Sequence, residues 1–177
     1  MKRVAVLTSG GDAPGMNSAI RAVARIGAAR GLSVLGVEHG YEGLIDGQFR
    51  ELCSGDPGSA LRLDRDVDLM GGRGGTLLGS ARSKRFLAPE GRARAFEQMR
   101  EAGIDGMLVV GGNGSLTGAH ALCQEHGARI IGVPASIDND IGCTSTAIGV
   151  DTALNTIVDA CDRISDTARA HRRAFVV

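Results

Sequence analysis

The sequence lacks the features that mark secreted, membrane and nucleic-acid-binding proteins. Its 20 basic and 20 acidic residues give a formal net charge of zero, so nothing in the charge indicates a nucleic acid or an anionic membrane as partner. No apolar run approaches the length of a membrane span, and the N-terminus has neither the apolar stretch nor the cleavage site of a signal peptide. We therefore expect a cytoplasmic protein.

Tryptophan is absent, and cysteines are few. The four cysteines show no CxxC or metal-type spacing, which favours reduced thiols over a disulfide or a zinc site; they are Cys53, Cys123, Cys143 and Cys161. Glycine, by contrast, is abundant at 27 residues and falls between apolar runs. This distribution is typical of α/β proteins that handle phosphate.

The glycine-rich stretch at residues 107–119 is the most informative local pattern. Met107 to Val110 is an apolar run typical of a buried parallel strand, and the glycines at 111, 112 and 114 allow a sharp turn. Ser115 is placed to N-cap the following helix. A strand, a glycine loop and a helix N-terminus together suit a phosphate, because free N–H groups and the positive end of the helix dipole face one point. A plain βα turn fits the loop equally well.

Apolar runs and helical patterns alternate along the whole chain. We expect strands at 4–7, 32–37, 107–110, 129–133 and 174–177. We expect four helices: one that begins near residue 17, one at 89–102, one that follows the glycine loop and ends near residue 126, and one at 145–168. Residues 39–43 are expected to form a loop. A solvated charged face is expected from Asp64, Arg65, Asp66 and Asp68. On the last helix we expect these residues to be buried: Ile148, Leu154, Ile157, Val158, Cys161 and Ile164.

This alternation predicts an α/β fold, with a doubly wound, mostly parallel sheet and helices on both faces, over residues 1–177. Because the chain stops in the first residues of an apolar strand, we expect it to be a fragment of a longer protein. Ligands of such sheets bind beyond the carboxyl ends of the strands, where the glycine loops are expected to converge.

The loops together carry the groups that phosphoryl transfer requires. Backbone amides at Gly11 and at 112–115 suit phosphate oxygens, Arg82 supplies a fixed positive charge, and Asp138 and Asp140 supply carboxylates for a metal and for the acceptor's proton. Taken singly, Asp138 fits a loop-capping aspartate and Arg82 a surface arginine.

Four motifs occur in the order and approximate spacing of 6-phosphofructokinase, so the chain resembles the N-terminal half of that enzyme. They are Ser9-Gly10-Gly11-Asp12-Ala13-Pro14-Gly15-Met16-Asn17, Gly74-Gly75-Thr76 with Leu78-Gly79-Ser80-Ala81-Arg82, Gly111-Gly112-Xaa-Gly114-Ser115, and Ile137-Asp138-Asn139-Asp140. The resemblance covers essentially the whole chain. It implies a two-lobe protein of which residues 1–177 are the nucleotide-binding lobe and the second lobe is absent, so that this fragment alone is inactive.

The resemblance implies transfer of a phosphoryl group from ATP to fructose 6-phosphate in glycolysis, giving fructose 1,6-bisphosphate and ADP with the help of Mg²⁺. Asp138 would be the general base, with Gly11 and Arg82 completing the catalytic set. The nucleotide would lie on Gly11, Tyr41, Arg82, Gly112, Asn113, Gly114, Ser115 and Gly118. The sugar phosphate would lie on Ser136, Asp138, Asp140 and, from a neighbouring subunit of a homotetramer, Arg173. The metal would lie on Asn113 and Asp140.

Departures from the family pattern leave alternatives open. Gly114 and Ala135 leave room for a nucleotide α-phosphate and favour ATP, whereas pyrophosphate-dependent relatives carry aspartate and lysine there. Asn113 replaces an aspartate that helps to bind magnesium, and an amide holds a hard cation less well; a non-catalytic nucleotide-binding or sugar-phosphate-binding subunit is therefore a further alternative. Arg21 and Arg25 match effector-binding positions of this allosteric family, or form a solvated helix face.

Overall fold

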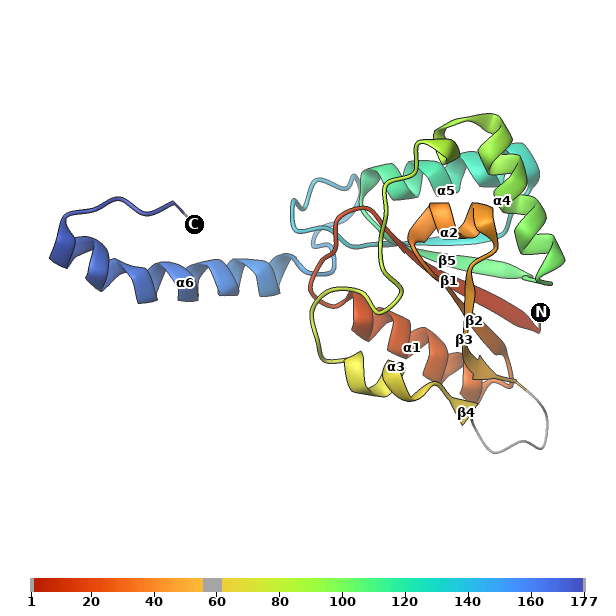
Figure 1. Ribbon diagram of the computed structural model, residues 1–177, viewed down its shortest axis with the longest axis horizontal. Helices are drawn as coiled ribbons and strands as arrows, with labels where there is room; N and C mark the ends of the chain where they lie inside the picture. The colour runs from red at the N-terminus through yellow and green to blue at the C-terminus, as the bar shows by residue number, and fades with distance from the viewer. Residues whose placement is uncertain (1, 56–61, 177) are drawn as a thin grey trace.

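The computed structural model describes residues 2–55 and 62–176. Within these ranges a six-stranded sheet has the order β4-β3-β2-β1-β5-β6 and carries helices on both faces (Figure 1). Four strands are parallel neighbours, namely β1 (Arg3–Ser9), β2 (Ser33–Val37), β5 (Gly106–Gly111) and β6 (Ile130–Pro134). The expected doubly wound, mostly parallel α/β fold is confirmed.

An antiparallel pair completes one edge of the sheet. It consists of β3 (Phe49–Ser54) and β4 (Arg62–Leu63), with β3 paired to β2. Both lie in the part of the chain to which the sequence pattern assigned no elements. Together with α3 (Arg65–Met70) they bring the chain back beside the first helix, as Figure 1 shows.

Alternate residues of the central strand face two separate hydrophobic layers. Val4 and Val6 pack in a core with α1 (Met16–Ala29) and α3, whereas Ala5 and Leu7 pack in a second core with α2 (Gly40–Asp46), α4 (Pro89–Glu101) and α5 (Asn113–His126). This period-2 alternation explains why β1 reads as a continuous apolar run: both of its faces are covered by helices. The 3₁₀ turn Arg85–Leu87 precedes α4.

The expected loop at 39–43 is wrong, because residues 40–46 form α2. His39 and Gly40 both have left-handed backbone conformations, with φ of 57° and 62°, and turn the chain from β2 into the helix. Tyr41, Leu44 and Ile45 then repeat at helical spacing and are buried. The glycines flanking Tyr41 conceal this short amphipathic pattern.

The expected burial along the last helix is also wrong beyond Ile148, which packs against the core that contains α1. Helix α6 (Val150–His171) projects away from the sheet, and among its described residues Val150 is buried while Leu154, Ile157 and Val158 are 50–58% exposed (Figure 1). The amphipathic stripe is present, but the part of the chain that the structure describes provides no surface to cover it. No helix in residues 2–55 and 62–176 is long and apolar enough to cross a membrane.

Two left-handed glycines fix the start of α6 and explain why it begins at residue 150 rather than near 145. Gly149 has φ of 103°, and a Cβ built on it would lie 2.7 Å from Cβ of Ala13. Gly15, with φ of 98°, approaches the side chain of Ile148 in the same way. The N-termini of α1 and α6 thus pack closely, because each contributes a glycine with no Cβ at the contact.

The strand expected at 174–177 does not form over its described residues. Residues 174–176 have no strand partner, and Val176 is fully exposed. Residue 177 lies outside the described ranges. An apolar run forms a strand only where a neighbouring strand offers its backbone, and residues 174–176 extend beyond the end of α6.

Candidate functional site

The loops after β1, β5 and β6 meet at the carboxyl ends of the parallel strands, together with the long loop between α3 and α4. The Ser80 hydroxyl donates a hydrogen bond to the Gly10 carbonyl. A Cβ at Gly10 would lie 3.3 Å from Oγ of Ser115, and one at Gly112 would lie 3.8 Å from Cβ of Ser136. The expected convergence of the loops is therefore confirmed.

Side chains from β1 hold the loop that leads to Arg82. Oγ1 of Thr8 lies 2.8 Å from Oγ1 of Thr76 and donates to the Gly79 carbonyl at 3.0 Å. The backbone N–H of His39 donates to the Leu78 carbonyl. These bonds fix a glycine-rich loop across the end of the sheet.

Asn17 fixes the same loop from α1, and the sequence reading gave it no role of its own. Its side chain is buried, and Nδ2 donates to the carbonyls of Arg73 at 3.0 Å and Gly74 at 3.2 Å. Oδ1 accepts from the Leu77 N–H at 2.6 Å. One amide therefore satisfies three backbone groups of a segment nearly sixty residues away.

Several glycine backbones at this end of the sheet face open space. Cβ atoms built at Gly11, Gly75 and Gly114 would meet no atom of the described residues within 4 Å. Gly114 lies in the first turn of α5, whose initial N–H groups have no partner inside the helix. The backbones of Gly11 and of residues 112–115, at the N-terminus of α5, thus form a cradle that suits an anion such as a phosphate.

The expected N-cap role of Ser115 is wrong. The N-cap of α5 is Gly112, and Ser115 lies inside the first helical turn, where it is buried against Gly10 and Gly111. The tight approach of Gly111 to Ser115 leaves no room for a longer connection, so the helix starts directly after the strand. Ser115 thus packs against the glycine loops instead of capping α5.

Tyr41 supports α5 from beneath. Its ring stacks on Phe86 with centroids 3.8 Å apart, and its hydroxyl donates to the Ser115 carbonyl at 2.6 Å. Burial raises the pKa of the Tyr41 hydroxyl, so this group stays a neutral donor. Gly118 packs on the same pair, because a Cβ there would lie 3.0 Å from Phe86. Nucleotide contacts by Tyr41 and Gly118 stay predictions, and the structure gives both a packing role.

The loop after β6 presents the two carboxylates. Asp138 and Asp140 are exposed, and Asn139 between them has a left-handed φ of 51°. The Asn139 side chain accepts from the Ala147 N–H at 3.0 Å, which draws the loop back on itself. Oγ of Ser136 accepts from the Asp138 N–H at 3.2 Å and keeps its own hydrogen to donate.

The two residues expected to hold a metal lie together. Nδ2 of Asn113 donates to the backbone carbonyl of Asp140 at 3.1 Å, which leaves one amide oxygen and the Asp140 carboxylate for a cation. Among the described residues no group of three or more histidine, cysteine or acidic side chains could hold a metal. The Asn113 amide oxygen and the Asp140 carboxylate fit Mg²⁺, because this ion keeps several waters and uses one or two carboxylates together with substrate phosphates.

Two expected arginines differ in position. Arg82 is exposed and ends the loop held by Thr8 and Asn17, and it forms no ion pair with another residue that the structure describes. Arg173 lies beyond the C-terminal end of α6, far from the strand ends where the other site residues gather (Figure 1). The structure therefore gathers at one end of the sheet the loops that carry Gly11, Arg82, residues 112–115, Ser136, Asp138 and Asp140. Tyr41 and Gly118 pack behind α5, and Arg173 lies apart.

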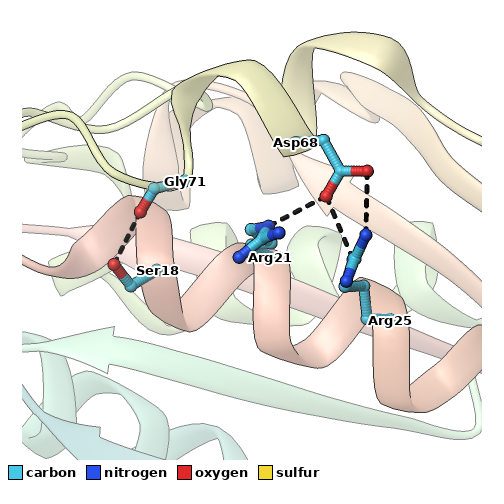
Figure 2. A network of polar contacts seen from close by, with 5 residues as sticks. All are labelled: Ser18, Arg21, Arg25, Asp68 and Gly71. Atoms are coloured by element: carbon cyan, nitrogen blue, oxygen red, sulfur yellow. Dashed lines mark hydrogen bonds and ion pairs between the residues drawn. The ribbon is translucent and has the colours of Figure 1, made fainter.

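Arg21 and Arg25 lie on α1, away from the cradle, and both pair with Asp68 of α3. Nε of Arg21 and Nε of Arg25 lie 2.8 Å and 3.0 Å from Oδ1 of Asp68. Figure 2 shows both guanidinium groups turned to this carboxylate, beside a hydrogen bond from Ser18 to the Gly71 carbonyl. Asp68 is exposed, as expected for a solvated face, and it also bridges two helices. The expectation is wrong for Asp64, whose side chain is 16% exposed and pairs with Arg50.

We expect Asp68→Asn to lower the free energy of unfolding at neutral pH and to have little effect in acid. Hydrogen bonds from Arg21 and Arg25 hold the pKa of the Asp68 carboxyl below its ordinary value. A carboxyl with a lowered folded pKa stabilises the fold above its unfolded pKa and loses that contribution as pH falls through the folded pKa. Urea unfolding at neutral pH and in acid measures the difference in free energy of unfolding between wild type and Asp68→Asn. The same difference at both pH values would contradict the prediction.

Comparison with known proteins gives consistent matches. Residues 3–177 match the family described as Phosphofructokinase. The chain is 52% identical to the ATP-dependent 6-phosphofructokinase of Thermotoga neapolitana and 49% identical to ATP-dependent 6-phosphofructokinase 1 of Thermus thermophilus; each match covers 100% of this chain and 52% of the relative. The structure of phosphofructokinase from Saccharomyces cerevisiae matches with a TM-score of 0.78 and 36% identity, over 99% of this chain and 25% of that one. The chain thus spans about half the length of the curated relatives it matches.

Proposed function

This chain belongs to the phosphofructokinase family, and on that premise we propose that it is the nucleotide-binding lobe of an ATP-dependent 6-phosphofructokinase. The full-length protein transfers the terminal phosphoryl group of ATP to the 1-hydroxyl of fructose 6-phosphate, giving fructose 1,6-bisphosphate and ADP. The proposal includes a cytoplasmic, homotetrameric, allosteric enzyme. The observation that supports it best is the junction of open glycine amides, Arg82 and two carboxylates at one end of the sheet.

The loop after β6 receives the acceptor in this proposal. The Asp138 carboxylate takes the proton of the sugar's 1-hydroxyl while the oxygen of that hydroxyl attacks the phosphorus. The Ser136 hydroxyl donates its hydrogen to the transferred phosphoryl group. Asp140 holds the sugar and contributes a carboxylate to the metal. Arg173, beyond the C-terminal end of α6, serves the sugar phosphate of a neighbouring subunit.

The donor lies across the cradle. The N–H groups of Gly11 and of residues 112–115 face its phosphate oxygens, and the Arg82 guanidinium balances the charge that develops during transfer. Mg²⁺, when bound through Asp140 and the Asn113 amide oxygen, supplies charge neutralisation for the phosphates. The backbone around Gly114 is open, which supports a nucleotide rather than pyrophosphate as donor.

A donor assay on the full-length protein tests the proposal. Purified protein with fructose 6-phosphate and Mg²⁺ is given either ATP or pyrophosphate, and fructose 1,6-bisphosphate is measured. We expect turnover with ATP and at most a small fraction of it with pyrophosphate. Activity with pyrophosphate alone would replace the proposal by its pyrophosphate-dependent alternative.

A non-catalytic nucleotide-binding or sugar-phosphate-binding subunit is the second candidate, and Asn113 is the residue that favours it. Absence of turnover with either donor, together with measurable ATP binding by calorimetry, would support this candidate. A large gain of turnover in Asn113→Asp would likewise indicate a chain impaired at its metal site. Wild-type turnover without such a gain would exclude it.

A further inference from the structure

We propose that Asn113 acts chiefly as a positioning residue: its amide nitrogen holds the backbone of Asp140 and thereby the loop that presents Asp138. This inference rests on the proposed phosphoryl transfer, and it gives Asn113 a role other than that of a weakened metal ligand. Nδ2 of Asn113 and the Asp140 carbonyl oxygen are 3.1 Å apart. Because a carbonyl oxygen only accepts, the group facing it must be the amide's nitrogen.

The loop from 135 to 149 has firm attachments at its two ends. The Ala135 N–H donates to the Gly111 carbonyl at 3.0 Å. Between the two ends of the loop, the Ser136 N–H donates to the Ile148 carbonyl and the Ile148 N–H donates to the Pro134 carbonyl. Further along, Ile141 is buried in a small cluster with Ala147 and Val150, against which Leu116 of α5 packs. These attachments close the loop on itself and on the end of β5.

The segment that carries the carboxylates has fewer attachments to the rest of the domain. Residues 137–140 are exposed, and the side chain of Asn139 binds only within the loop, to Ser145 and Ala147. Among the described residues, the hydrogen bond from Asn113 is the one that ties this segment to α5. Together with the packing of Leu116 against the neighbouring Ile141 cluster, this hydrogen bond sets how far the carboxylates lie from the amides of the cradle.

Asn113 itself is held firmly. It is the first residue of α5, and its carbonyl accepts from Oγ1 of Thr117 at 2.9 Å one turn later. A rigid helix end thus provides a fixed donor to a loop whose position decides the geometry of transfer. An aspartate here has no hydrogen to donate at neutral pH, and its charge would face the Asp140 carbonyl oxygen.

The test compares Asn113→Asp and Asn113→Ala in the full-length protein with Gln124→Glu as a control. Gln124 is exposed near the other end of α5, so its variant repeats the amide-to-carboxylate change away from the site. We expect kcat to fall about tenfold in both Asn113 variants, because each loses the bond that positions the carboxylates. We expect the half-saturating Mg²⁺ concentration of Asn113→Asp to stay within about twofold of wild type, and Gln124→Glu to retain wild-type kcat.

Hydrogen exchange gives a readout that does not require turnover. In the protein without nucleotide and magnesium, peptides covering 135–149 are expected to exchange about fivefold faster in both variants, while peptides of β1 and β5 keep wild-type rates. A higher kcat with tighter Mg²⁺ binding in Asn113→Asp would overturn the inference, as would unchanged exchange in residues 135–149. An inactive wild type would instead contradict the proposed function, and the exchange measurement would still decide the role of Asn113.

Discussion

Asp138→Asn is expected to lower kcat of the full-length protein by about a thousandfold, with the KM for fructose 6-phosphate little changed. A positioned general base contributes a factor of about 10²–10⁴, and an asparagine of the same shape cannot take the proton of the attacking hydroxyl. The side chain is exposed, so the substitution removes chemistry without disturbing a core. Steady-state kinetics with ATP and fructose 6-phosphate measures the effect, since a loss confined to kcat indicates a group that acts in the transition state.

Two controls sharpen this experiment. Glu51 is an exposed carboxylate on β3, and Glu51→Gln makes the same chemical change away from the strand ends, so it should retain wild-type kcat. Equal thermal midpoints of wild type and Asp138→Asn would show that the fold is intact. A kcat within about threefold of wild type would rule out Asp138 as the general base.

Asn17→Ala is expected to destabilise the protein by about 3 kcal/mol. The substitution removes three hydrogen bonds to residues 73, 74 and 77, and each bond contributes on the order of 1 kcal/mol. The Leu77 N–H contributes the largest part of this destabilisation, because Leu77 is half-buried and water replaces the lost acceptor poorly. The midpoint of urea unfolding, compared at equal protein concentration, measures the change.

Asn17→Asp separates the two kinds of bond that this side chain makes. The carboxylate keeps the acceptor for Leu77, but it faces the carbonyls of Arg73 and Gly74 without a hydrogen to donate. We expect it to be at least as destabilising as Asn17→Ala at neutral pH, because a buried charge then lies against two carbonyl oxygens. A shift below about 0.5 kcal/mol in both variants would show that the loop is held by other contacts.

Periodicity predicted the parts of the fold that depend on local sequence. The buried parallel strands read as apolar runs because helices cover both faces of the sheet, and α1 and α4 read as amphipathic helices. The short helix α2 was missed because glycines flank its one aromatic residue. The exposed face of α6 was read as buried because a pattern of apolar residues indicates that a face prefers contact, without showing whether this chain supplies the contact.

The candidate site was predictable where it depends on backbone motifs and not where it depends on distant side chains. Gly11, Gly114, Asp138 and Asp140 gather as expected because the carboxyl ends of parallel strands lie on one edge of the sheet. The bonds of Asn17 to residues 73–77 connect positions whose separation in sequence gives no pattern. Likewise, the attachment of Asn113 to Asp140 joins two loops whose spacing in space only the fold determines.

The packed glycines at the start of α6 make that helix a lever. Its 22 residues extend about 33 Å from Gly149, so a tilt of about 10° about this point moves the far end by about 6 Å. The short arm of the lever is Gly149 itself, in contact with Ala13 and Pro14 beside the open backbone of Gly11. Any tilt of α6 at this contact would therefore be enlarged along the helix toward Arg173.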